Sequence, residues 1–182
     1  DALPIWILVD PGLPAQVLTA RLSERANLAP DDVTDLFFTS FQPDTTRGVD
    51  AFTHADWWVS REERESVGVA MAQRLRAIRT GEGIEAGADE DELAAVLERG
   101  VAILQRANVA REELAHGVFA YPMPGVTPGL TGLLIEGTRF TTLVCGDAVP
   151  TVEHLEGDRV LPGAHDLDAA KASMQEALEV AD

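Results

Sequence analysis

Cysteine, lysine and histidine are scarce in this sequence of 182 residues. Cys145 is the only cysteine, which excludes an internal disulfide framework and makes a cytoplasmic location the default expectation. It lies in the apolar run TTLVCGD, where we expect a buried, unreactive thiol. Lys171 is the only lysine, so almost every cation of the chain is an arginine.

Long apolar runs and nucleotide-binding motifs are also missing. No stretch approaches the roughly 18 apolar residues that span a bilayer, and the first residues lack the layout of a signal peptide. Neither a GxGxxG nor a GKS/T motif is present. With 31 acidic residues against 14 basic ones, the net charge of −17 repels phosphate backbones and anionic lipids. We therefore expect no nucleic-acid partner and no membrane association.

What is present is an alternation of strand and helix patterns over the first half of the chain. The run LPIWILVD predicts a strand buried on both faces that ends at the turn beginning with Pro11. Strands are predicted next at VTDLFFTS and FTHADWWVS, after a helix from Pro14 to about Leu28. Apolar spacing then predicts helices over 61–79 and from about 89 to 108. Capping boxes are predicted at the starts of these two helices, with Ser60 and Asp89 as the capping residues.

The second half predicts antiparallel strands and a final helix. The strand patterns are HGVFAYPM, GLTGLLIEG and FTTLVCGDAV, and the tight turn near GTR indicates a β-hairpin. A helix is predicted from Asp166 through Ala181, and the acidic, glycine-rich segment 80–91 is predicted to be a surface loop. These patterns favour a single layered α/β or α+β domain over residues 1–182.

The order of these landmarks is similar to that of the metallo-β-lactamase superfamily. ILVDPG, TSFQPDTTRG, ADWWVS, PGVTPGLTGLLI and TTLVCGDAV occur in the family's order and spacing. The resemblance implies a four-layer αβ/βα sandwich of the metallo-β-lactamase type. The family also has a strand before ILVDPG and a histidine-bearing strand after the last helix, so the resemblance leaves open whether the fold is truncated at both ends.

The resemblance also places a metal site on residues that are not histidines. On the family's HxHxDH motif the three histidines fall on Ser40, Gln42 and Thr45, while the aspartate is kept as Asp44. The histidine of the family's PGHT turn falls on Val126, and the aspartate of its GD motif is kept as Asp147. A catalytic zinc needs about three protein ligands, usually including imidazoles. We therefore expect no catalytic residues and no cofactor; the alternative is one divalent metal ion held by Asp44 and Asp147.

Three further residues are candidate neighbours of this pocket. Arg47 follows Asp44 on the same predicted loop and could hold carboxylates in place of a metal, or point into solvent. Asp10 ends the first predicted strand, where the resemblance implies that it orients the site loop from behind; alternatively, it only accepts backbone hydrogen bonds in the turn. His54 could reach the pocket as a base or could simply pack beside the neighbouring tryptophans.

Two functions from different classes follow from these residues. The first hypothesis is a metallo-hydrolase-like domain that has lost its metal centre, a pseudoenzyme that binds a small molecule or docks a partner protein. The alternative is a metal-dependent hydrolase of esters, lactones or thioesters with a reduced ligand set. The sequence names no ligand or substrate, and it leaves self-association open.

Overall fold

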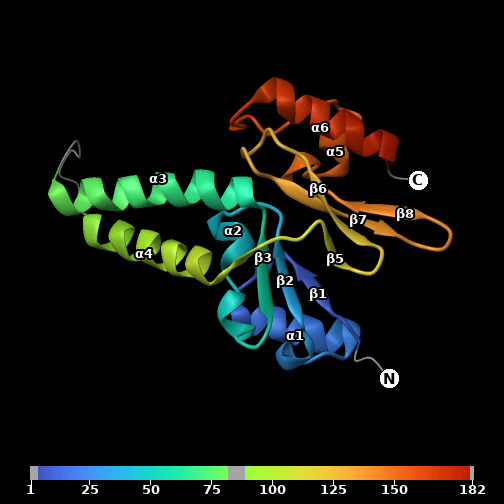
Figure 1. Ribbon diagram of the computed structural model, residues 1–182, viewed down its shortest axis with the longest axis horizontal. Helices are drawn as coiled ribbons and strands as arrows, with labels where there is room; N and C mark the ends of the chain where they lie inside the picture. The colour runs from blue at the N-terminus through green and yellow to red at the C-terminus, as the bar shows by residue number, and fades with distance from the viewer. Residues whose placement is uncertain (1–3, 82–88, 181–182) are drawn as a thin grey trace.

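Two β-sheets that face each other form the centre of the molecule (Figure 1). The computed structural model describes residues 4–81 and 89–180. Each sheet has four strands, in the orders β1-β2-β3-β4 and β5-β6-β7-β8. The chain completes the first sheet before it begins the second, which matches the change in sequence pattern between the two halves.

The first sheet is parallel throughout. Its strands are β1 (Ile7–Val9), β2 (Asp35–Phe38), β3 (Asp56–Val59) and β4 (Asn108–Val109). The expectation that β1 is buried on both faces is wrong, because β1 lies at the edge of this sheet and its residues are only partly buried. The short strand β4 was not predicted, since a two-residue strand has no detectable period.

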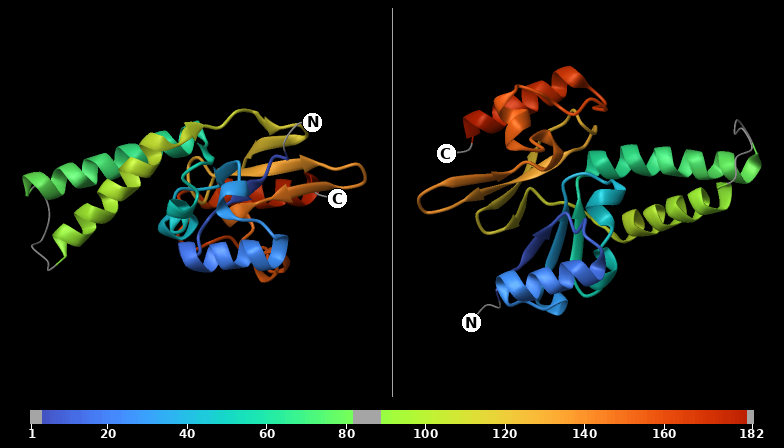
Figure 2. Two further views of the ribbon diagram at one scale, coloured as in Figure 1. Left: turned by 90° about the horizontal axis from the view of Figure 1, so that it is seen from below. Right: turned by 180° about the vertical axis from the view of Figure 1, so that it is seen from behind.

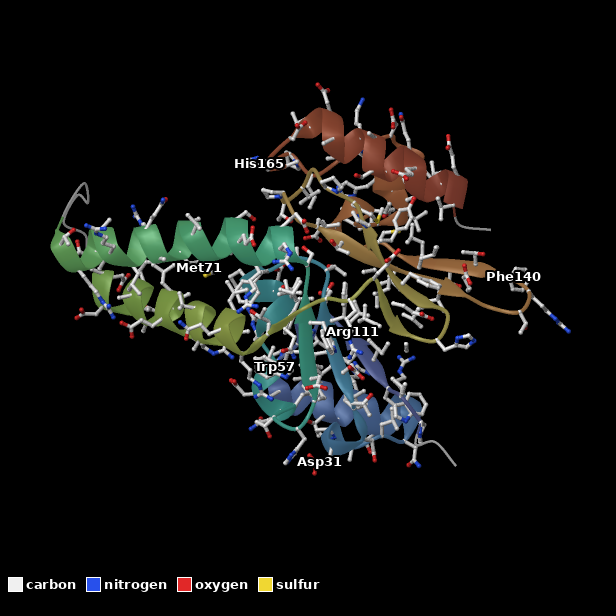
Figure 3. All side chains as sticks on the ribbon, viewed as in Figure 1. Asp31, Trp57, Met71, Arg111, Phe140 and His165 are labelled. Carbon is white, nitrogen blue, oxygen red and sulfur yellow. The ribbon has the colours of Figure 1, made fainter. Side chains whose placement is uncertain are left out.

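The second sheet is antiparallel, as predicted. It contains β5 (Glu113–Ala115), β6 (Val118–Pro122), β7 (Thr131–Glu136) and β8 (Thr141–Val144). The predicted hairpin is formed by β7 and β8, with Gly137 N–H donating to Phe140 O at 3.0 Å across the turn. Phe140 marks the exposed tip of this hairpin in Figure 3.

Alternating side chains along β2 create the layers. Phe37 points to the space between the sheets, where it packs with Trp58 and Leu133. Leu36 and Phe38 point the other way, into a core that includes Leu18 of α1 (Ala15–Ala26). Helix α6 (Leu167–Val180) covers the outer face of the second sheet. The resulting helix, sheet, sheet, helix order is the predicted αβ/βα sandwich.

Helices α3 (Arg61–Thr80) and α4 (Glu90–Arg106) lie side by side and project from the sandwich, as Figures 1 and 2 show. At the start of α3, Ser60 Oγ accepts from Glu63 N–H at 3.1 Å, but the Glu63 carboxylate bonds elsewhere, so only half of the predicted capping box forms. The second predicted box is wrong, because the Asp89 side chain makes no capping hydrogen bond. Most of the predicted acidic loop lies outside the described residues.

Two short helices were not predicted. These are α2 (Pro43–Thr46), within the TSFQPDTTRG segment, and α5 (Val152–Glu156). Each is about one turn long, too short for a helical period to appear in the sequence. Within the described residues no helix is both long and apolar enough to cross a membrane.

Candidate functional site

Three loops meet where β1, β2 and β8 end. Asp10 N–H donates to Phe37 O at 3.0 Å, which fixes the end of β1 beside β2. Gly12 packs against the backbone of Asp44 so closely that a Cβ atom would collide with it. Gly146 packs in the same way against the side chain of Thr39, in a backbone conformation with φ of 52° that suits glycine. The strand-end loops therefore bring Asp10, Asp44 and Asp147 to one place.

Asp10 is held under this site by Thr39. The Asp10 carboxylate accepts from Thr39 N–H at 2.9 Å and from the Thr39 hydroxyl at 2.7 Å. Burial raises the pKa of Asp10 to about 6, although the two hydrogen bonds from Thr39 oppose this rise and the negative charges of Asp147 and Asp44 add to it. Asp10 is thus bound to the β2 loop through Thr39, a residue that the sequence did not single out.

Asp147 follows β8 in the 3-10 turn Gly146–Ala148 and faces the β2 loop. Burial raises the pKa of Asp147, and the nearby negative charge of Asp44 raises it further. Gln42 Nε2 donates to Asp147 Oδ2 at 3.4 Å, a long hydrogen bond between segments about a hundred residues apart in the chain. Asp44 and Asp147 are therefore close enough for the charge of one to act on the other.

The other predicted site residues are mostly engaged in holding the loop. Thr45 Oγ1 lies 2.8 Å from Ser40 O and 2.9 Å from Gln42 O, and it accepts from Gln42 N–H at 3.1 Å. Ser40 is completely buried, and its hydroxyl has no hydrogen-bond partner among the described residues. Val126 packs in an apolar cluster that includes Ala148.

Arg47 and His54 do not contact these carboxylates. Arg47 forms no ion pair within residues 4–81 and 89–180, and its side chain lines a separate cavity beside α3 and α4. His54 precedes β3 rather than following it, and its exposed ring lies 4.0 Å from Asp31 at the far end of the sheet (Figure 3). The roles of Arg47 as a partner for carboxylates and of His54 as a base stay predictions. In the structure neither residue lies with Asp44 and Asp147.

Glu63 is a structural residue of the site that sequence reasoning missed. Its fully buried carboxylate accepts from Phe41 N–H at 2.7 Å and from Gly129 N–H at 3.2 Å. It thereby ties the β2 loop to the PGVTPG turn at the first turn of α3. The signal was visible as the Ser60 to Glu63 spacing, but the spacing indicated only a helix cap.

The side chains present do not fit a zinc centre. The donors at the family's metal positions are two carboxylates, an amide and two hydroxyls, without an imidazole or thiolate, and hydroxyl and amide oxygens are weak zinc ligands. Thr45 is already occupied by loop hydrogen bonds, and Val126 has no donor atom. No group of three or more His, Cys, Asp and Glu side chains suited to a metal occurs in the described part of the chain.

Solved structures with the same fold include hydrolases. The chain superposes on AidC, a dizinc quorum-quenching lactonase, with a TM-score of 0.69 and 22% identity over 95% of this chain and 63% of that one. The hydrolase AbOPH of the beta lactamase superfamily gives a TM-score of 0.67 and 19% identity over 93% of this chain and 62% of that one. A mutant of AiiA from B. thuringiensis with N-decanoyl-L-homoserine bound gives a TM-score of 0.62 and 22% identity, over 96% of this chain and 71% of that one.

Sequence comparison leads to the same family. This chain spans less than two thirds of the lengths of AidC and AbOPH, and at these identities the similarity shows the fold alone. A search of curated protein sequences found no relative of this chain. The family model of the metallo-beta-lactamase superfamily matches residues 5–181. The chain therefore belongs to the metallo-beta-lactamase superfamily.

Proposed function

We propose that this chain is a non-catalytic member of its superfamily, which binds a small molecule or a partner protein over the strand-end loops without hydrolysing it. The observation that carries the proposal is the chemistry of the metal positions. Ser40, Gln42, Thr45 and Val126 stand where imidazoles would be needed. Strand-end loops of this kind present binding residues even where chemistry has been lost.

The arrangement of the substituted residues supports this proposal. Thr45 stabilises the loop with its hydroxyl, and Val126 contributes its side chain to an apolar cluster. Both residues therefore have structural roles in holding these loops. The net charge of −17 supports a partner other than nucleic acid or an anionic membrane.

The alternative is a hydrolase with a reduced set of metal ligands. One observation favours it: three carboxylates lie close enough to affect one another, as the raised pKa of Asp10 shows. Carboxylate and hydroxyl oxygens suit a harder ion than zinc. In that case Asp44 and Asp147 would hold the ion, which would supply Lewis-acid chemistry for a lactone or ester.

Metal analysis separates the two functions. The chain is purified without chelator, and its metal content is measured by plasma mass spectrometry before and after loading with zinc, manganese, iron, magnesium and calcium. We expect no bound metal under any of these conditions, together with no turnover of lactone or ester panels. One or two equivalents per chain with hydrolysis would contradict the proposal.

Matched variants show whether any retained metal belongs to the site. Asp44→Ala with Asp147→Ala removes both candidate ligands. Asp31→Ala with Asp91→Ala removes the same number of charges from exposed positions on other elements. Metal lost from the first pair and kept in the second would assign it to the strand-end loops and establish the hydrolase.

A further inference from the structure

A second cavity lies between α2 and the projecting helices α3 and α4. Its volume is about 220 Å³, and its apolar wall comprises Phe41, Met71, Val96, Gly100 and Ile103. Figure 3 shows Met71 between the two helices. A cavity of about 150 Å³ is large enough to hold benzene, so this one has room for a somewhat larger apolar group.

The cavity has a buried floor and an open rim. Phe41 and Ile103 are only 5% and 6% exposed, whereas Val96 at the rim is 53% exposed. Gly100 is buried in the middle of α4, and a Cβ atom there would lie 2.9 Å from the Met71 sulfur. The glycine therefore lets the flexible Met71 thioether form one wall, which suits a ligand of variable shape.

Two arginines stand at the rim. Arg99 is paired with Asp50 at 2.8 Å, whereas Arg47 makes no ion pair within the described residues. Arg47 is exposed, so its guanidinium is accessible to an anion that enters from the rim. A guanidinium can bind a carboxylate through two parallel hydrogen bonds.

We propose that this cavity binds a small amphiphilic carboxylate. The apolar body would lie against Phe41, Met71 and Ile103, and the carboxylate would pair with Arg47. The inference rests on the proposed binding function, since it names the class of ligand. Gln42 lines the same cavity and contacts Asp147, so the cavity adjoins the strand-end site without using its carboxylates.

Calorimetric titration of the full chain with octanoate and octan-1-ol tests the proposal. Octanoate carries the carboxylate and octanol lacks it, and we expect octanoate to bind about tenfold more tightly or better. Arg47→Gln should remove this preference and leave octanol binding unchanged. Arg139→Gln, beside the exposed hairpin tip, is the matched control and should retain the preference for octanoate over octanol.

A second pair of measurements tests the apolar part. Binding should strengthen from butanoate to octanoate, and Val96→Trp, which fills the exposed rim, should weaken both ligands while circular dichroism stays unchanged. Equal affinity for octanoate in the parent chain and in Arg47→Gln would overturn the proposal. So would the absence of octanoate binding to the folded chain, or a dimer that Val96→Trp dissociates, which would make this surface a self-association face.

The metal analysis keeps this proposal separate from the previous one. Octanoate binding that fails in a metal-free chain overturns only the carboxylate cavity. Metal retained at Asp44 and Asp147 with lactone hydrolysis overturns the non-catalytic function, whatever the octanoate titration gives. The two results come from different residues and different readouts.

Discussion

Asp10 at the end of β1 has an uncommon backbone conformation and a partly buried carboxylate. Its φ of 50° lies in the left-handed region, where aspartate is among the better-tolerated residues. Its carboxylate is mostly enclosed and accepts two hydrogen bonds from Thr39. Such a residue orders a loop, but burial opposes its ionisation.

The effect of burial on the ionisation of Asp10 should be visible in the pH dependence of the free energy of unfolding. The raised pKa, about 6 in the folded chain against 3.8 for an ordinary aspartate, means that the folded state binds the proton more tightly. The contribution of Asp10 is therefore most favourable below pH 4 and is lost as the pH rises to about 6. Relative to Asp10→Asn, the parent chain should lose roughly 1–3 kcal/mol of unfolding free energy over this window.

Urea unfolding of both proteins at a series of pH values between 3.5 and 7.5 measures the difference. Asp31→Asn, which alters an exposed aspartate, serves as the control and should run parallel to the parent. Parallel curves for Asp10→Asn and the parent would show that Asp10 titrates like an exposed aspartate.

Glu63 is a second residue whose buried hydrogen bonds should contribute to stability. Glu63→Ala would leave two buried backbone N–H groups, those of Phe41 and Gly129, without acceptors. We expect a loss of about 2–4 kcal/mol of unfolding free energy in denaturant titration, since each buried unpaired donor costs about 1–3 kcal/mol. The neighbouring exposed Glu62→Ala should change it by less than about 0.5 kcal/mol. Similar values for the two variants would refute the proposed role of the Glu63 carboxylate.

At the scale of elements, α3 and α4 form a projecting pair rather than a further layer. The base of α4 reaches the core, where Ile103 and Leu104 join the side chains of β2 and β3. Val67 and Met71 of α3 pack against the same core. Farther out along α4, Val96 is exposed. The pair therefore derives its stability mainly from its base and from contacts between the two helices.

This gradient predicts unequal effects of truncation along α4. Ile103→Ala removes buried methyl groups and should cost about 2–5 kcal/mol of unfolding free energy, whereas Val96→Ala should cost less than about 0.5 kcal/mol. Thermal or urea unfolding followed by circular dichroism gives both values. If Val96→Ala were as destabilising as Ile103→Ala, α4 would have to be covered on the side that is exposed here.

For the whole molecule, the dominant property is the excess of negative charge. The net charge of −17 is spread over 182 residues, and the ion pairs of the structure are mostly exposed. Exposed pairs contribute little, so they do not offset the general repulsion. Repulsion of this kind destabilises the compact state and is screened by salt.

Sodium chloride should therefore stabilise the chain. Between 0.05 and 0.5 M salt at pH 7.5 we expect a rise in Tm of a few degrees, equivalent to about 1 kcal/mol or less for a domain of this size. Repeating the scan at pH 4.5, where many carboxylates are protonated, should reduce the rise. A Tm that falls with salt at pH 7.5 would mean that attractive pairs outweigh the repulsion.

Local patterns in the sequence predicted the order of the main elements and the change from alternating strands and helices to antiparallel strands. Apolar periodicity and turn residues act within short segments, so they identified α1, α3, α4 and α6 and the β7–β8 hairpin. The family's landmarks then indicated that Asp44 and Asp147 would approach each other. These features depend on local pattern or on a shared order of motifs.

Contacts between residues far apart in the chain were visible only after folding. In the folded chain β1 lies at an edge of its sheet, and Arg47 lines the cavity beside α3 and α4. The Glu63 carboxylate accepts hydrogen bonds from the backbone N–H groups of Phe41 and Gly129. The partners of a side chain depend on which loops lie next to it after folding. One spacing of residues in the sequence is compatible with several different sets of partners. For this reason the hydrogen-bond partners of Glu63 and the surroundings of Arg47 could not be predicted from the sequence.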